Sequence, residues 1–323
     1  TRITRTMKKP LTYISLFSSA GVGCFGFKQQ GFECIATNEI LNKRLKIQVF
    51  NNKCKYETGY LDGDISTNEV KNNLFSEIEK WQTKHKISEP DVIISTPPCQ
   101  GMSVANHKKS NELGRNSLVV ESIKITKTVN PKFFIFENVR TFLNTTCTDI
   151  DGKDKPIEEA IKLNLGGHYN ILFKIVNFKD YGSNSSRTRT LVIGVRKDLQ
   201  NISPYDIFPN KQKPKKIRNL FDGLTKLNEM GQISDTDIFH SFREYDKKML
   251  PWIENLNEGQ SAFENEDHTK IPHRIIDNII VYNKNKNGDK YARWFWDKEG
   301  PCIHTRNDIL ASQNTIHPEE NRV

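Results

Sequence analysis

The stretch Val92-Ile93-Ile94-Ser95-Thr96-Pro97-Pro98-Cys99-Gln100 joins a short apolar run to a cysteine through two consecutive prolines. The apolar residues predict a buried strand. Proline has a fixed φ and no N–H group, so Pro97 and Pro98 must end that strand. Cys99 then follows the carboxyl end of a strand, the edge at which open α/β sheets bind their ligands. On these residues alone, Cys99 is explained equally well as a small buried side chain that only packs.

The segments around this strand alternate between strands and helices as far as Arg196. We expect strands over 11–17, 32–37, 133–136, 171–177 and 190–195, and helices over 24–30, 69–86 and 117–129. This alternation predicts a doubly wound α/β fold with a mostly parallel sheet. After residue 197 the pattern dissolves into a polar region rich in Asn and Lys. The expected domains are therefore 1–196, a second, smaller domain over 197–290, and a return to the first domain over 291–323.

Composition limits the classes of function. Lys and Arg number 48 against 39 Asp and Glu, and the resulting charge of +9 favours an anionic partner such as nucleic acid. No apolar run is long enough to span a membrane, and the first residues lack the apolar centre of a signal peptide. The six cysteines lie far apart without a C-x-x-C pair, which argues against a zinc site or a disulfide framework. We therefore expect an intracellular protein with reduced thiols.

Three polar features follow the first two strands. The small-residue turn from Phe17 to Gly23 lets backbone N–H groups approach a ligand, although such turns are also common for steric reasons. About 20 residues further on, Glu39 stands where an acidic residue commonly binds the hydroxyls of a ribose. Its alternative is a solvated surface glutamate. Asp64 could accept a hydrogen bond from an adenine amino group, or it could cap the helix that follows it.

Two further groups of polar residues lie near strand ends. The apolar run over 133–136 ends in Glu137, which places a carboxylate at the same sheet edge as Cys99. Arg187 and Arg189 point the same way in an extended chain, although paired arginines are also common as solvated surface charges. The polar stretch over 104–115 is long enough to act as a mobile lid.

The order of these stretches resembles that of the DNA cytosine-C5 methyltransferase family. The matching stretches are Phe17-Ser18-Ser19-Ala20-Gly21-Val22-Gly23, Asn38-Glu39, Gly63-Asp64-Ile65, Pro97-Pro98-Cys99-Gln100, Glu137-Asn138-Val139, Arg187-Thr188-Arg189 and Ile316-His317-Pro318-Glu319. Together they span nearly the whole chain. The most specific part is the pair Pro-Cys-Gln and Glu-Asn-Val, about forty residues apart and each after a buried strand.

The resemblance implies that the chain transfers a methyl group from S-adenosylmethionine to C5 of a cytosine flipped out of duplex DNA, leaving S-adenosylhomocysteine. It implies that Cys99 adds to C6 of the ring as a thiolate, that Glu137 acts at N3, and that Arg189 holds O2 with Arg187 behind it or near the phosphates. The cofactor-binding residues that it implies are Phe17, Ser18, Ser19, Ala20, Gly21, Val22, Gly23, Glu39, Ile40, Asp64, Ile65 and Pro97. The substrate-binding residues that it implies are Pro98, Gln100, Ser103, Arg115 and Asn138.

The resemblance also implies the partners and the location. Double-stranded DNA is the expected substrate, no metal is required, and residues 197–290 would read the target sequence at base edges and phosphates. Bacterial members of the family protect host DNA beside a restriction nuclease. We therefore expect a component of a restriction-modification system in the cytoplasm, associated with the nucleoid through DNA binding.

The sequence departs from the family pattern in three places. Ser19 replaces the first glycine of Phe-x-Gly-x-Gly, and Ser185 replaces the glutamine of Gln-x-Arg-x-Arg. The sequence also stops at Val323, before a further strand and a terminal helix that complete the cofactor site in the family. Either the sequence is truncated or a second polypeptide supplies these elements, and we expect weak cofactor binding by this chain alone.

Three other functions account for part of the sequence. A tRNA-modifying branch shares the Pro-Pro-Cys-Gln and Glu-Asn-Val residues but resembles a shorter chain, whereas about 90 residues separate Arg196 from Tyr291 here. An inactive DNA-binding or subunit-like protein would keep the fold, although every residue that the chemistry needs is present. A dinucleotide-dependent enzyme would explain the glycine turn and Glu39, but it leaves Cys99 and Glu137 without a role.

Overall fold

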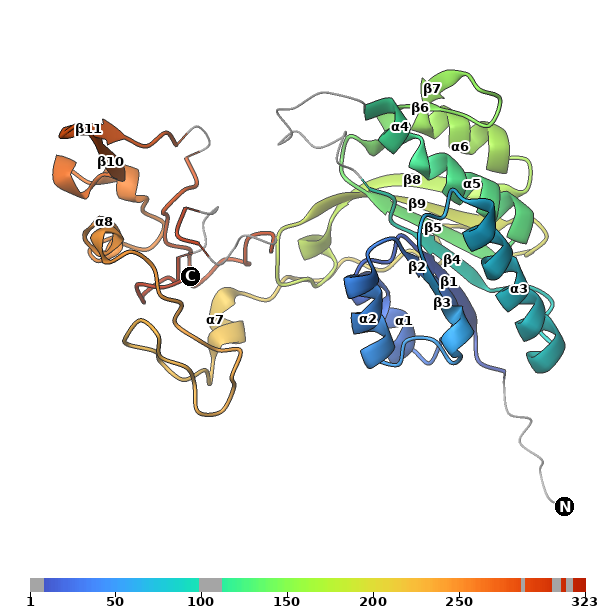
Figure 1. The fold of residues 1–323 in the computed structure, drawn as a ribbon, viewed down its shortest axis with the longest axis horizontal. Coiled ribbons are helices and arrows are strands. Elements are labelled where there is room, and N and C mark those ends of the chain that lie inside the picture. Colours follow the sequence, from blue (N-terminus) through green and yellow to red (C-terminus); the bar gives the residue numbers. More distant parts are fainter. Residues whose placement is uncertain (1–8, 99–111, 286–287, 304–308, 312–315) are drawn as a thin grey trace, which may run out of the picture. The chain divides into compact units, whose positions relative to one another are not determined.

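The computed structural model of the protein describes residues 9–98, 112–285, 288–303, 309–311 and 316–323 (Figure 1). The side chains of Glu112 and Arg115 are also outside this description. Contacts divide the chain into two compact units. The first unit comprises Thr1–Val176 and Thr188–Phe208, and the second comprises Asn177–Arg187 and Pro209–Val323.

A seven-stranded sheet forms the centre of the first unit, in the order β3-β2-β1-β4-β5-β9-β8. Its strands are β1 (Thr12–Leu16), β2 (Glu33–Glu39), β3 (Tyr60–Asp62), β4 (Val92–Ser95), β5 (Phe133–Asn138), β8 (Tyr169–Asn177) and β9 (Thr188–Arg196). The first five pair in parallel with their neighbours, whereas β9 runs antiparallel to β5. This confirms the predicted α/β fold with a mostly parallel sheet. Because β1 lies between β2 and β4, the strand order reverses there, and ligands bind at such a reversal in open sheets.

Helices cover the sheet because side chains alternate between its two faces. The helices of this unit are α1 (Phe25–Gln29), α2 (Asn42–Phe50), α3 (Asn68–His85), α4 (Glu112–Asn116), α5 (Leu118–Val129) and α6 (Ile157–Leu165). Ile14 and Leu16 of β1 pack in a core with α3, whereas Tyr13 belongs to the core on the other face, with Phe27 of α1. A third core joins β5 to α5 and α6. Short 3-10 turns and a small hairpin of β6 (Thr146–Thr148) and β7 (Asp154–Pro156) complete the unit.

The second unit contains little regular structure. Its described elements longer than three residues are α7 (Ile217–Phe221), α8 (Leu250–Ile253), β10 (His273–Ile276) and β11 (Ile279–Tyr282), with β10 and β11 forming an antiparallel hairpin. The buried members of its apolar core are Trp252, Ile253, Leu256, Ala262, Tyr291, Leu310 and Ile316.

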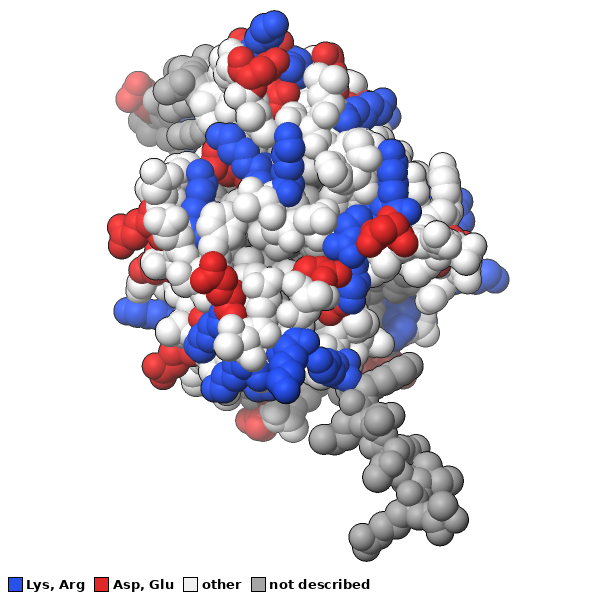
Figure 2. Space-filling view, turned by 90° about the vertical axis from the view of Figure 1, so that its right-hand side faces the viewer, with Lys and Arg blue, Asp and Glu red and all other residues white. Residues whose placement is uncertain are grey.

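The excess positive charge is not gathered into one patch on the face drawn in Figure 2. Lys and Arg side chains alternate there with Asp and Glu. Among the described residues, no helix is long and apolar enough to cross a membrane. The same part of the chain contains no group of three or more His, Cys, Asp or Glu that could hold a metal ion.

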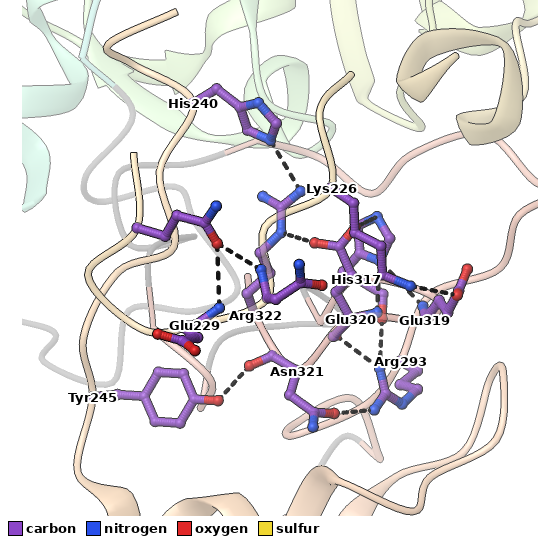
Figure 3. A network of polar contacts seen from close by, with 12 residues as sticks. Lys226, Glu229, His240, Tyr245, Arg293, His317, Glu319, Glu320, Asn321 and Arg322 are labelled. Atoms are coloured by element: carbon purple, nitrogen blue, oxygen red, sulfur yellow. Dashed lines mark hydrogen bonds and ion pairs between the residues drawn. The ribbon is translucent and has the colours of Figure 1, made fainter. Parts of the chain in front are cut away.

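The predicted domain boundaries differ from the two units because residues 291–323 group with the second unit. Arg293 explains this difference. Its buried guanidinium donates hydrogen bonds to the carbonyl oxygens of Ile253, His317 and Glu320, and so ties the end of the described chain to α8 (Figure 3). Residues 177–187 also belong to the second unit, whereas 197–208 belong to the first.

Candidate active site and cofactor pocket

A pocket of about 440 Å³ opens in the first unit where β1 to β4 reach their carboxyl ends. Its lining residues are Phe17, Ser19, Asn38, Glu39, Ile40, Leu41, Arg44, Gly63, Asp64, Ile65, Thr96, Pro98 and Leu118. Six of the predicted cofactor residues therefore come together: Phe17, Ser19, Glu39, Ile40, Asp64 and Ile65. The lining combines one buried carboxylate with several apolar side chains, which suits a ligand with both a polar and an aromatic part.

Glu39, the last residue of β2, organises the turn that follows β1. One carboxylate oxygen accepts the Ser19 N–H at 2.7 Å and the other accepts the Leu41 N–H at 3.0 Å. Only 5% of Glu39 is exposed, which rules out the surface-glutamate alternative. Ser19 has φ 51°, a left-handed conformation that residues other than glycine rarely adopt. Ser19 thus adopts a conformation that a glycine reaches without strain, and the carboxylate holds its amide.

The remaining predicted cofactor residues lie elsewhere in the first unit. Ala20, Gly21 and Val22 line a neighbouring pocket of about 300 Å³ with Tyr13 and Cys24. Gly23 and Pro97 line neither pocket, and Ser18 is buried, with its hydroxyl donating to the Asn38 carbonyl at 2.9 Å. The turn from Phe17 to Gly23 therefore separates two hollows and faces the larger one through Phe17 and Ser19.

Asp64 is not the cap of α3, which was one of its two predicted roles, but it shapes the turn before that helix. Its carboxylate accepts the Ser66 N–H at 2.8 Å, and its carbonyl accepts the Thr67 hydroxyl at 2.8 Å. Thr67 is the residue that caps α3, since its own hydroxyl accepts the Val70 N–H. Asp64 thus shapes the turn before α3, and it lines the pocket as well.

The ends of β4 and β5 are joined by Asn138. Its side-chain amide donates to the Pro97 carbonyl at 3.0 Å, and its oxygen accepts the Val139 N–H at 2.8 Å. Asn138 is 3% exposed, so this bond forms away from water, where it is strongest. The Pro97-Pro98 segment is therefore fixed beside the end of β5. Cys99, Gln100 and Ser103, which follow it, lie outside the described residues.

The two charged residues predicted to face the cytosine are paired. Glu137 on β5 and Arg189 on β9 form an ion pair with 3.0 Å between Oε1 and Nε. Arg189 also donates from Nη1 to the Thr188 carbonyl at 2.7 Å. Both side chains remain about one-fifth exposed, at 23% for Glu137 and 19% for Arg189. The pair is therefore ordered but still open to a ligand.

The other residues predicted to bind the substrate lie in different parts of the chain. Pro98 lines the cofactor pocket. Arg187 belongs to the second unit, where it donates from Nη1 to the Cys302 sulfur at 3.3 Å. Arg115 lies on α4, and its side chain is outside the described residues.

Sequence reasoning gave no role in the site to three residues that shape it. Thr96 donates from its hydroxyl to the Phe17 carbonyl at 2.8 Å, and Asn38 donates to the carbonyls of Leu61 and Gly63. Both lie at the carboxyl ends of strands, Thr96 directly after β4 and Asn38 one residue before the end of β2, a signal that was available. Gln48 of α2 carries no such signal, because its partners become neighbours only in the folded chain.

Comparisons with known proteins agree with this geometry. The family model for C-5 cytosine-specific DNA methylase matches residues 11–323. The chain is 29% identical to the Type II methyltransferase M1.HgaI of Avibacterium volantium, over 97% of this chain and 82% of that protein. It is 32% identical to the Type II methyltransferase M.FnuDI of Fusobacterium nucleatum, over 67% of this chain and 55% of that protein.

One solved structure has the same fold over nearly the whole chain. It is the crystal structure of a DNA modification methyltransferase encoded within an Escherichia coli prophage, with a TM-score of 0.64 and 20% identity, covering 97% of this chain and 85% of that one. The sheet order, the pocket and the matched family model lead to one conclusion. The chain belongs to the C-5 cytosine-specific DNA methylase family, whose members methylate C5 of cytosine with S-adenosylmethionine as the methyl donor.

Proposed function

We propose that Cys99 is the nucleophile of this methyltransferase and that Glu137 and Arg189 hold the target cytosine opposite it. The observation that carries the proposal is the 3.0 Å bond from the Asn138 amide to the Pro97 carbonyl. Cys99 follows Pro98 directly in the sequence. The bond therefore starts the cysteine segment at the same sheet edge as Glu137.

The chemistry explains why these groups are needed together. C5 of cytosine is a poor nucleophile until a thiolate adds to C6, which moves the electrons of the C5–C6 double bond into the ring. Glu137 donates or shares the proton that N3 takes up as this charge develops, which requires its carboxyl group to be protonated when the base binds. Bound S-adenosylmethionine supplies the methyl group to C5. A base then takes up the C5 proton, the electrons of the C5–H bond restore the C5–C6 double bond, the Cys99 sulfur leaves as a thiolate, and N3 returns its proton to Glu137.

The ion pair gives Arg189 a second task. A guanidinium has five N–H donors, more than the two contacts to Glu137 and Thr188 use. Arg189 can therefore orient the Glu137 carboxyl and still donate to the cytosine O2. For Arg187, which belongs to the second unit, we propose a contact with a phosphate of the same DNA.

We place the cofactor in the 440 Å³ pocket. The residues present fit it, since the buried Glu39 carboxylate can accept from ribose hydroxyls while Phe17, Ile40 and Ile65 offer apolar surface to an adenine ring. Asp64 is exposed at the rim of this pocket and can accept from the adenine amino group.

The nucleophile is tested with Cys99→Ser and the matched control Cys302→Ser, which keeps an acceptor for Arg187. Methyl transfer to duplex DNA should fall by at least about 1,000-fold for Cys99→Ser and remain for the control. DNA carrying 5-fluorocytosine should trap the wild-type protein covalently, since fluorine at C5 cannot leave as a proton. Trapping of the Cys99→Ser protein through another residue would overturn the assignment.

We further propose that the second unit reads the DNA sequence. The candidates are His240, Arg243, Arg274 and the polar stretch over 284–290, and both arginines are exposed. His240 is a weaker candidate because its Nε2 is engaged by Arg322 at 3.0 Å. Exchanging residues 209–290 with those of a relative of different specificity should move the methylated site, and bisulfite sequencing would show it. An unchanged site would contradict this role.

The relatives' names support a place in a Type II restriction-modification system, and with it a cytoplasmic location beside the DNA.

The second polypeptide stays a prediction. Val22 and Phe25 line the smaller pocket and are 80% and 56% exposed, and we propose this surface as its contact. Calorimetry with and without the product of a neighbouring gene should then show tighter S-adenosylmethionine binding in its presence. Equal binding in both titrations would remove the need for it.

A further inference from the structure

Gln48 of α2 is a buried amide directly beneath the turn that carries Ser19. It is 1% exposed. A Cβ added to Gly21 of that turn would lie 3.1 Å from the Gln48 Cγ, so the turn rests on this side chain. A buried amide has two N–H donors and two acceptor positions, and each one left without a partner destabilises the fold. The partners of Gln48 therefore decide what it does.

All four positions of the Gln48 amide are used. Its Nε2 donates to the Ser19 carbonyl at 2.6 Å and to the Ser18 hydroxyl at 2.8 Å. Its Oε1 accepts from the Thr37 hydroxyl at 2.8 Å and from the Lys53 ammonium at 2.9 Å.

The direction of this network is fixed at both ends. The Lys53 ammonium can only donate, and it also donates to the Thr37 hydroxyl at 2.9 Å, so Thr37 donates onward to Gln48. At the other end the Ser18 hydroxyl donates to the Asn38 carbonyl and accepts from Gln48. The amide cannot be reversed without opposing donor to donor, so its N–H groups face the turn.

Ser19 is thereby held from both sides. Its N–H donates to Glu39, and its carbonyl accepts from Gln48. Ser19 needs both contacts more than a glycine would, because its left-handed φ of 51° is unfavourable for a residue with a Cβ. Loss of either contact frees the turn to relax away from the pocket.

We propose that Gln48 is a positioning residue for S-adenosylmethionine, acting through the carbonyl of Ser19. It keeps the Ser19 N–H on Glu39, and the Glu39 carboxylate is thereby held in the orientation that receives the ribose. The inference rests on the cofactor site proposed above. It explains how this chain uses a serine where its family has glycine.

The first test is Gln48→Glu, which keeps the shape and both acceptor positions but removes the two donors to the turn. The dissociation constant of S-adenosylhomocysteine, measured by calorimetry, should rise about 10-fold, as expected when a buried acceptor loses its donor. The KM for S-adenosylmethionine should rise equally, with kcat within about 2-fold, since only binding is affected. Gln30→Glu, at an exposed position, is the matched control and should bind as the wild type does. Wild-type affinity in Gln48→Glu would overturn the proposal.

The second test separates positioning from general stability. Glycine adopts the left-handed conformation without strain, so in a Ser19→Gly background the effect of Gln48→Glu should shrink to below about 3-fold. An equal effect in both backgrounds would mean that Gln48 does not act through Ser19.

Thr37→Val is the milder variant if Gln48→Glu does not fold. It removes one donor to Oε1, leaves both bonds to the turn, and should weaken binding about 2-fold to 3-fold, whereas unchanged binding would count against the network.

A third variant distinguishes this inference from the cofactor site itself. If the pocket is the cofactor site, Glu39→Gln should weaken the binding of S-adenosylhomocysteine whether or not Gln48 positions the turn. Unchanged affinity in Glu39→Gln would overturn the site and the inference together. Weakened affinity in Glu39→Gln with wild-type affinity in Gln48→Glu would overturn the inference alone.

Discussion

The interiors of the two units are stabilised by different kinds of contact. In the first unit, neighbouring strands repeat the same pairing, and apolar side chains fill the core on both faces of the sheet. In the second unit, a small apolar core is joined to a buried cation, Arg293, and to His317, which stacks on Phe221 at 5.3 Å between ring centres. A repeated sheet spreads its stability over many contacts, whereas the second unit concentrates it in a few polar side chains. Single substitutions should therefore have larger effects in the second unit.

Arg293→Met should produce the largest effect. It leaves the carbonyls of Ile253, His317 and Glu320 without their donor. We expect a loss of about 3–5 kcal/mol in the free energy of unfolding of the second unit. Three of the four tryptophans, Trp252, Trp294 and Trp296, belong to that unit, so urea unfolding followed by tryptophan fluorescence reports on it.

The matched control is Arg218→Met. Arg218 is 58% exposed and pairs with Asp297 at 3.0 Å, so its loss should cost less than about 1 kcal/mol. Equal effects of the two substitutions would show that burial of Arg293 is not what holds the second unit.

Acid should give the second largest effect, through His317. Burial lowers the pKa of His317 from 6.5 to about 4. Its Nδ1 accepts the backbone N–H of Glu320 at 2.8 Å, as a neutral imidazole does. Between pH 6.5 and 4 the unfolded chain takes up a proton that the folded chain does not, so the free energy of unfolding falls as pH falls, by up to about 3 kcal/mol in all.

The measurement is urea unfolding by tryptophan fluorescence across that pH window. His317→Asn keeps an acceptor but does not titrate, so it should lose this part of the pH dependence. A wild-type slope in the variant would assign the effect to other groups.

Asn138→Leu tests the first unit at the hydrogen bond from the Asn138 amide to the Pro97 carbonyl. The Pro97 carbonyl loses its buried donor, which should lower the free energy of unfolding by about 1–3 kcal/mol. Urea unfolding followed by far-ultraviolet circular dichroism measures this loss. Methyl transfer should also fall, because the segment that leads to Cys99 loses its attachment to β5. Asn144→Leu, at an exposed position, serves as the control. A stable Asn138→Leu protein with wild-type activity would contradict the role given to this bond.

Thr67→Ala should give the smallest effect. The Thr67 hydroxyl accepts the Val70 N–H at 3.4 Å at the start of α3. Losing this cap should cost about 1 kcal/mol in thermal or urea unfolding, and Thr67→Ser should restore most of it. A loss as large as that of Arg293→Met would remove the contrast between the units.

Local sequence patterns predicted six of the seven strands of the sheet and missed β3 and several helices of the same unit, including α2 and α6. The expected strands correspond to β1, β2, β4, β5, β8 and β9, because each has an apolar run of strand length. The pattern gave no indication of α2, whose buried side includes the polar Gln48, while Ile47 and Phe50 are 47% and 85% exposed. It also missed β3, which has only three residues at the edge of the sheet.

The sequence alone determined the order of strands and turns, the strand ends that carry Glu39, Glu137 and the Pro97-Pro98 segment, and the family that this order resembles. These features are local, since apolar periodicity and proline act on their own neighbours in the chain. Only the tertiary structure decided that Ser19 adopts a left-handed conformation between Glu39 and Gln48, and that Arg293 ties residues 291–323 to the second unit. Ser19 and its partner Glu39 are 20 residues apart in the sequence, and Arg293 and its partner Ile253 are 40 residues apart. No local pattern specifies a partner at that separation.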